Sequence, residues 1–108
     1  FRLLGAWEAD TGTIYIREGL PSPERECVLA HELEHAIRGD VGPQSPETEA
    51  GIDIEVARRF VDPWEYTCVE KSGGGGGAQK AKSLDLPTWV VQAWAKKISL
   101  DRSFAPCA

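Results

Sequence analysis

Several features are scarce or missing in this 108-residue chain, and each absence excludes a class of protein. No stretch approaches the roughly 18 apolar residues of a membrane span, and no charged-then-apolar leader is present, so we expect a soluble, cytoplasmic protein without a membrane partner. Methionine is absent altogether, so we expect the sequence to be part of a longer or processed chain. The three cysteines, Cys27, Cys68 and Cys107, fit neither a disulfide framework nor a CxxC metal knuckle, which favours a reducing compartment.

Basic residues are in the minority and are unevenly distributed. Residues 1–72 contain seven Lys or Arg and fifteen Asp or Glu, for a net charge of −8, whereas residues 73–108 have a net charge of +3. The acidic part lacks the basic surface that binding to a phosphate backbone requires, so we expect no direct contact with nucleic acid. Five consecutive glycines at 73–77 offer no side chain to bury, and they predict a flexible linker over residues 72–82.

The spacing of apolar residues predicts a hairpin followed by a helix. Residues 6–17 alternate around the turn Asp10-Thr11-Gly12 and place Trp7, Ile14 and Ile16 on one side of a hairpin. Beyond Pro21, the sequence predicts a helix that is capped by Ser22 and ends at Gly39. Its buried stripe is predicted to consist of Val28 or Leu29, Leu33, Ala36 and Ile37.

Two further segments have helical spacing. In residues 47–61 the apolar stripe is Ile52, Val56 and Phe60, and Pro63 ends the pattern. Residues 83–108 are predicted to form a short amphipathic helical tail of unknown role, although residues 88–91 also suit a strand. The tail's helical stripe is Leu86, Val90, Ala93, Trp94 and Ile98. We therefore expect a main domain at residues 1–71, the linker at 72–82 and the tail at 83–108.

The predicted helix at 22–38 contains the motif HExxH, and this motif holds both histidines of the chain. His31 and His35 are four residues apart, so their imidazoles lie one turn apart on the same face and can reach one metal ion. Glu32 is offset by about 100° around the helix, which leaves it free to act as a base. Zinc held in this way lowers the pKa of water towards about 7, so that Glu32 can accept its proton during attack on a peptide carbonyl. The alternative is a solvated helix face with two ordinary histidines.

A catalytic zinc needs a third protein ligand, and the chain has no other histidine. The helix at 47–61 offers the carboxylates Glu47, Glu49, Asp53 and Glu55. Glu49 precedes Ile52 by three residues at the head of the apolar stripe, so it is our first choice, and Asp53, one turn on, is the second. Cys27 lies one turn before His31 and could be a ligand, but a buried packing residue is the favoured interpretation. Asp40 could accept a hydrogen bond from an imidazole N–H, but a loop or capping role is the favoured interpretation.

The stretch from Trp7 to Pro63 resembles the ImmA/IrrE-type metallopeptidases of bacteria and phages. The resemblance rests on the hairpin with TGTIYI, the run ERECVLAHELEHAIRGD, and the later helix with EVARRFV before a proline. The second of these runs is especially similar to the short actinobacterial and actinophage branch.

The resemblance implies a minimal zincin-like α+β fold, in which a small antiparallel sheet flanks the HExxH helix and a glutamate-bearing helix. Carried over by position, His31, His35 and Glu49 are the zinc ligands and Glu32 is the general base. Family members include proteases that cut repressors, which implies a DNA-binding repressor as substrate, extended along the sheet edge at residues 14–17. No oxyanion stabiliser can be assigned; Tyr15 and Tyr66 are the candidates, and packing is the favoured interpretation of each.

Three functions are therefore in competition. The leading hypothesis is a zinc-dependent endopeptidase of narrow specificity. A non-catalytic zinc-bound module that binds a regulator is the first alternative, and the presence of Glu32 disfavours it because a scaffold needs no base. A helical domain without metal is the other alternative.

Overall fold

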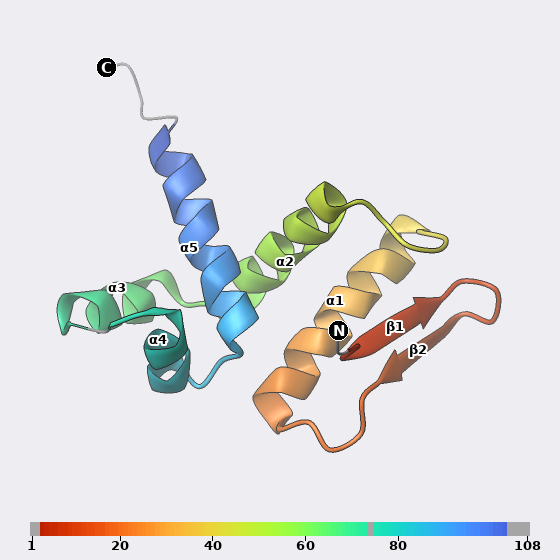
Figure 1. Ribbon diagram of the computed structural model, residues 1–108, viewed down its shortest axis with the longest axis horizontal. Coiled ribbons are helices and arrows are strands. Elements are labelled where there is room, and N and C mark those ends of the chain that lie inside the picture. Colours follow the sequence, from red (N-terminus) through yellow and green to blue (C-terminus); the bar gives the residue numbers. More distant parts are fainter. Residues whose placement is uncertain (1–2, 74, 104–108) are drawn as a thin grey trace.

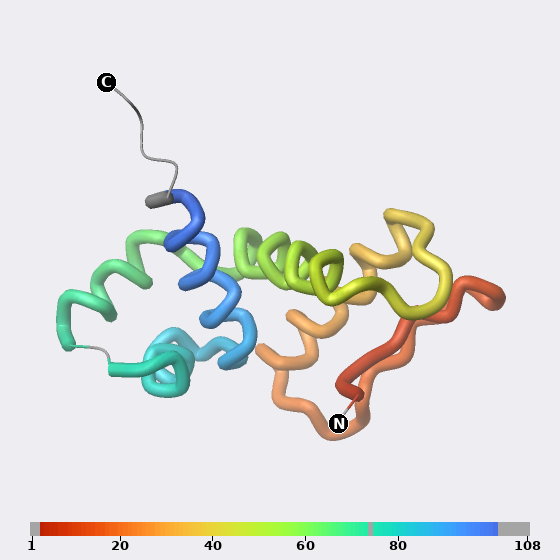
Figure 2. The backbone as a smooth tube through the Cα atoms, turned by 45° about the horizontal axis from the view of Figure 1, so that its top comes forward, coloured from red at the N-terminus to blue at the C-terminus, as the bar shows by residue number. Residues whose placement is uncertain are grey.

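The computed structural model describes residues 3–73 and 75–103, which form an α+β arrangement of a two-stranded antiparallel sheet and five helices (Figure 1). The hairpin and the first helix lie at one end of the molecule, the last three helices lie at the other, and the second helix connects them (Figure 2). In chain order, the elements are β1 Gly5–Glu8, β2 Thr13–Ile16, α1 Ser22–Arg38, α2 Pro46–Phe60, α3 Pro63–Lys71, α4 Gly77–Leu84 and α5 Thr88–Ser103.

The predicted hairpin is confirmed. Strands β1 and β2 pair with Trp7 opposite Ile14, and Gly5 opposite Ile16. The turn between the strands contains Gly12 at φ 65°, a left-handed conformation that glycine adopts without steric cost. Packing of this hairpin on α1 places β1 beside the HExxH motif.

The HExxH helix forms where the sequence predicts it, but its cap differs. Helix α1 begins at Ser22 directly after Pro21, and no side chain caps it, so Ser22 is its first residue and not its N-cap. The helix ends at Gly39, whose φ of 73° turns the chain out of the helix. The amide of Asp40 then donates to the carbonyl of His35, which holds Asp40 against the end of the helix.

The predicted apolar stripe of α1 is wrong for Leu33 and Ile37, whereas of the alternatives Val28 and Leu29 it is Val28 that is buried. Leu29, Leu33 and Ile37 are 41%, 39% and 72% exposed, whereas Cys27 and Val28 are buried. Helix α1 packs against both α2 and the hairpin, and the face between those contacts carries the two histidines. The opposite face, where the leucines and Ile37 lie, is therefore left in solvent.

Helix α2 has the predicted stripe. Ser45 caps it by accepting a hydrogen bond from the Thr48 amide, and Ile52 and Val56 are buried with Phe60 half-buried beside the core. Pro63 does not simply terminate this pattern but begins α3, since the Asp62 side chain accepts hydrogen bonds from two amides of that helix. The sequence analysis did not anticipate α3.

The C-terminal segments pack on α2 and share one hydrophobic core with it. Val90, Val91 and Trp94 of α5 are buried among α2, α3 and α4, and residues 88–91 are helical. Helix α4 begins at Gly77, so part of the segment expected to be a flexible linker is helical. The side chain of Ala81 in this helix is buried in the shared core. Cys107 lies outside the described residues. Within the described part of the chain, no helix is long and apolar enough to cross a membrane.

Candidate metal centre

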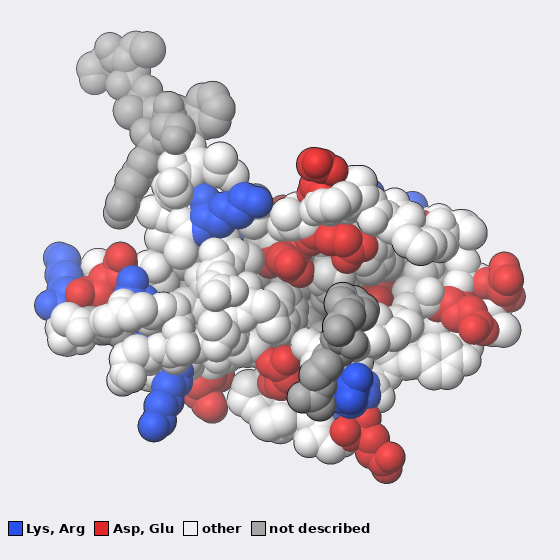
Figure 3. Space-filling view, in the orientation of Figure 1, with Lys and Arg blue, Asp and Glu red and all other residues white. Residues whose placement is uncertain are grey.

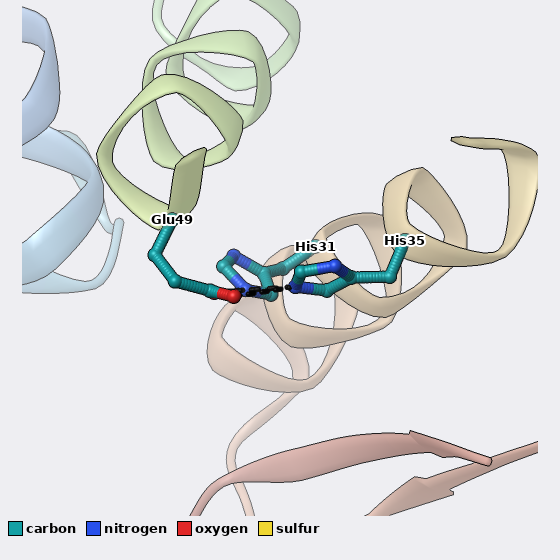
Figure 4. Close-up of side chains that lie close together, drawn as sticks. All are labelled: His31, His35 and Glu49. Carbon is teal, nitrogen blue, oxygen red and sulfur yellow. Dashed lines mark hydrogen bonds and ion pairs between the residues drawn. The ribbon is translucent and has the colours of Figure 1, made fainter. Parts of the chain in front are cut away.

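Three side chains from two helices converge where α1 faces α2. His31 and His35 project from α1 one turn apart, and Glu49 reaches them from the first turn of α2 (Figure 4). The Oε1 atom of Glu49 lies 3.0 Å from Nε2 of His31 and 3.2 Å from Nε2 of His35. Ligand atoms of the three residues lie within 4.8 Å of one another, so they could hold one metal ion.

The other nitrogen of each imidazole faces an aspartate. Nδ1 of His31 is 2.9 Å from Asp53 Oδ1, and Nδ1 of His35 is 2.8 Å from Asp40 Oδ2. A neutral imidazole has a single N–H, so it can donate to one carboxylate only. A metal ion at the two Nε2 atoms would leave both N–H groups on Nδ1, each donating to its aspartate, as the ligating histidines of metal sites usually do.

The structure thus separates the two carboxylates that the sequence left as alternatives. Glu49 is on the Nε2 side of both rings, whereas Asp53 is on the Nδ1 side of His31 and is not part of the three-residue cluster. Asp40 also accepts a hydrogen bond from Arg38 Nε at 3.0 Å, and its backbone carbonyl accepts one from the Trp7 indole at 2.9 Å. The latter bond ties the hairpin to the end of α1.

Carboxylates and burial set the charge states of the cluster. Burial lowers the pKa of His31, but the hydrogen bond and charge of Asp53, with contributions from Glu32 and Glu49, outweigh it and raise that pKa above 6.5. The hydrogen bond from His35 lowers the pKa of Asp40 below 3.8, although burial opposes this effect. Asp40 is therefore ionised at neutral pH and can accept the imidazole N–H.

Glu32 lies beside the cluster and is 8% exposed. Burial raises the pKa of its carboxyl above the ordinary value of 4.5, against the opposing charges of His31 and His35. Its side chain is held in a tight space, because a Cβ atom added at Gly5 would lie 3.2 Å from Glu32 Cγ and 2.7 Å from Val28 Cγ1. The close approach of β1 to α1 therefore requires glycine at position 5.

A cleft of about 830 Å³ opens over these residues and is lined by His31, Glu32, His35, Glu49 and Asp53. One wall is β1 with the residues just before it, and Trp89 of α5 contributes a second wall. Acidic side chains gather across the middle of the face shown in Figure 3, whereas basic side chains lie mainly towards α3, α4 and α5. The clustered acids are consistent with a site for a cation.

The edge at residues 14–17, where the substrate strand was expected, does not border the cleft. Strand β2 does not line the cleft and β1 does, because β1 packs directly on α1 at Gly5 and holds β2 further out. Neither tyrosine considered as an oxyanion stabiliser lines the cleft: Tyr15 is exposed on β2, and Tyr66 is buried against Trp94.

Cys27 packs as a buried apolar residue near the motif. It is fully buried, and burial together with Glu24 and Glu26 raises the pKa of its thiol to about 12. A thiol in that state is a poor ligand and a poor nucleophile.

Three features of the site were missed at the level of sequence. The sequence indicates Asp53 only as an alternative ligand, Gly5 carries no motif that reveals its close contact, and Trp89 belongs to the predicted tail. A helical pattern could predict that α5 exists, but not where it docks.

Comparison with known families agrees with this geometry. A family model for the IrrE N-terminal-like domain, a peptidase family, matches residues 2–60, just over half of the chain. The chain belongs to this family. The matched part of this IrrE N-terminal-like domain includes the hairpin, α1, α2 and the whole cluster, and it ends before α3. No curated protein and no solved structure matches the chain.

Proposed function

We propose that this protein is a zinc-dependent endopeptidase, with His31, His35 and Glu49 as metal ligands and Glu32 as the general base. The observation that carries the proposal is the convergence of both Nε2 atoms on Glu49, with an aspartate at each Nδ1. Family membership supports a metallopeptidase-type activity.

The donor set fits zinc. Two imidazole nitrogens and one carboxylate oxygen form the three-ligand set of catalytic zinc sites, which keep a fourth position open for substrate or water. Zinc bound there supplies Lewis acidity that polarises a peptide carbonyl and acidifies water.

Glu32 is suited to the proton transfers. Its carboxylate borders the same cleft as the three ligands, and its raised pKa makes it a stronger base than an ordinary glutamate. It accepts the proton of the attacking water and passes it to the leaving amine. Asp53 and Asp40 orient the two imidazoles and are positioning residues.

The substrate is a protein segment in extended form. Strand β1 pairs with β2 along one edge and borders the cleft, so a substrate strand can lie beside β1 above the cluster. A cytoplasmic DNA-binding repressor is the substrate class that the resemblance favours, and the acidic body argues that the enzyme reaches it by protein contact and not by binding DNA.

The test is cleavage of a tryptic peptide library from a bacterial proteome by the zinc-loaded full chain, with new termini identified by mass spectrometry. Glu32→Gln should lower the cleavage rate about 10²–10⁴-fold while zinc content and the circular dichroism spectrum stay unchanged. Glu34→Gln is the matched control, since Glu34 lies two residues away and points towards Arg59 of α2. Equal cleavage by the Glu32→Gln and unmodified proteins would refute the proposal and favour a non-catalytic interaction module.

A further inference from the structure

From the position of Trp89 we infer that its indole forms the wall of an apolar subsite, which selects a large aliphatic or aromatic substrate side chain next to the scissile bond. The inference rests on the proposed endopeptidase function and names a residue that lies outside the family match at 2–60. It concerns the residue class that the enzyme selects and not the bond-breaking step.

The indole is held against the candidate metal centre. Its ring lies 6.0 Å from the ring of His31, measured between centroids, at an interplanar angle of 90°. Its Nε1 atom donates a hydrogen bond to Glu24 Oε1 at 3.3 Å, which links α5 to the first turn of α1. One side of Trp89 is thus fixed by α1 while the ring borders the cleft.

The backbone that carries Trp89 is anchored in the core. The next two residues, Val90 and Val91, are 0% and 1% exposed, and both of their amides donate to the carbonyl of Pro87. An aromatic ring on so constrained a backbone loses little conformational entropy when a ligand packs against it. Trp89 is therefore a preformed wall.

The surroundings of the indole define what can bind beside it. The other apolar side chains that line the cleft are those of Leu3, Leu4, Ala6, Trp7, Val28 and Pro43. Of the three carboxylates that line the cleft, Glu49 and Asp53 are engaged with His31, and Glu32 interacts electrostatically with both histidines, so all three belong to the metal site and not to this wall. An uncharged, bulky side chain can pack against Trp89 in this cleft, whereas an acidic one would lose its hydration among carboxylates without gaining a partner.

The first experiment compares cleavage of paired peptides. A sequence cut from the proteome library is resynthesised with Leu, Phe, Ala or Asp at each position flanking the scissile bond. At one of these positions the unmodified enzyme should prefer Leu or Phe over Ala by about tenfold or more in kcat/KM, and Trp89→Ala should reduce that preference about tenfold. The ratio within one variant is independent of how much of that variant is folded.

Two control variants accompany Trp89→Ala. Trp64→Ala removes the same side chain from α3, where Trp64 is 72% exposed and outside the cleft, and its Leu-to-Ala ratio should equal that of the unmodified enzyme. Trp89→Phe keeps an aromatic wall but loses the bond to Glu24, and it should retain most of the preference. An unchanged ratio in Trp89→Ala would overturn the inference even if the enzyme is an active peptidase.

The second experiment needs no cleavage. Alanine, leucine and phenylalanine hydroxamates are titrated calorimetrically into the zinc-loaded full chain. Leucine and phenylalanine hydroxamates should bind more tightly than alanine hydroxamate to the unmodified protein and to Trp64→Ala, and this difference should shrink about tenfold in Trp89→Ala. Discrimination by the hydroxamates without peptide cleavage would refute the endopeptidase and leave the apolar subsite standing. Equal binding of all three to the unmodified protein would overturn the subsite.

Discussion

Zinc affinity should distinguish a ligand from a positioning residue within one helix. Glu49 and Asp53 lie one turn apart on α2 and both contact His31, but at different nitrogens. Glu49→Ala removes a proposed ligand, whereas Asp53→Ala removes only the acceptor that orients the imidazole. The two substitutions should therefore weaken zinc binding to different extents.

The structure sets the expected sizes. Loss of the outer partner of a metal-bound histidine weakens metal binding 10- to 100-fold. The Asp53 side chain is 35% exposed, and water partly replaces it, so we expect the lower end: about tenfold in Kd, or about 1.4 kcal/mol. Glu49→Ala removes one of only three protein ligands and should weaken binding more than about 100-fold.

The assay is competition for zinc with a chromophoric chelator at pH 7.5, with circular dichroism to check folding. Glu47→Ala is the matched control, because Glu47 is an exposed acid of the same first helical turn and should leave the Kd unchanged. Equal losses in the Asp53 and Glu49 variants would mean that Asp53 is also a ligand. An Asp53 variant that matches Glu47→Ala would refute the orienting role.

Two further predictions concern pH and backbone packing. The pKa of His31 is raised in the folded protein, so in chelator-treated protein its ion pairs stabilise the fold fully below pH 6.5, and this stabilisation is lost as the pH rises through the folded-state pKa. Urea titrations from pH 6 to 8 should therefore show the unfolding free energy falling. A rise over this range would contradict the assignment. Gly5→Ala places a Cβ atom 2.9 Å from the Tyr15 carbonyl oxygen and should lower the unfolding free energy by about 1–3 kcal/mol. Gly51→Ala is the control: the position faces open space on α2, and the substitution should raise the unfolding free energy by up to about 1 kcal/mol. A neutral Gly5→Ala would show that β1 can move away from α1.

The parts of the site that depend on local spacing were predictable from the sequence. The four-residue separation of His31 and His35 is enough to place them on one face of any helix, and the offset of Glu32 follows from the same geometry. Glu49 was favoured because it precedes Ile52 by three residues, so burial of Ile52 turns Glu49 towards α1. These relations depend only on spacing within one helix and hold however the other elements pack.

Features that depend on docking were not predictable. Apolar periodicity assigned Leu33 and Ile37 to the core, yet α1 buries the face with the histidines because two elements contact it there. Nothing in the residues around Trp89 indicates that it meets His31, since 58 positions separate them and only the packing of α5 on α2 brings them together. Gly5 likewise shows its role only once β1 lies against Val28.

The segment beyond the family match supports the helix that carries Glu49 and also supplies one wall of the cleft. Val56 and Ala57 of α2 are 2% and 0% exposed because Val90, Val91 and Trp94 of α5 share a core with them. Without α5, that apolar face of α2 would be open to water, and burial of apolar surface is what fixes a helix against its neighbour. Glu49 and Asp53 are carried by the same helix, so the placement of both carboxylates against His31 depends on residues that the family match does not include. The C-terminal helices thus contribute to the candidate metal centre in two ways: they pack against α2, and they place Trp89 beside the cleft.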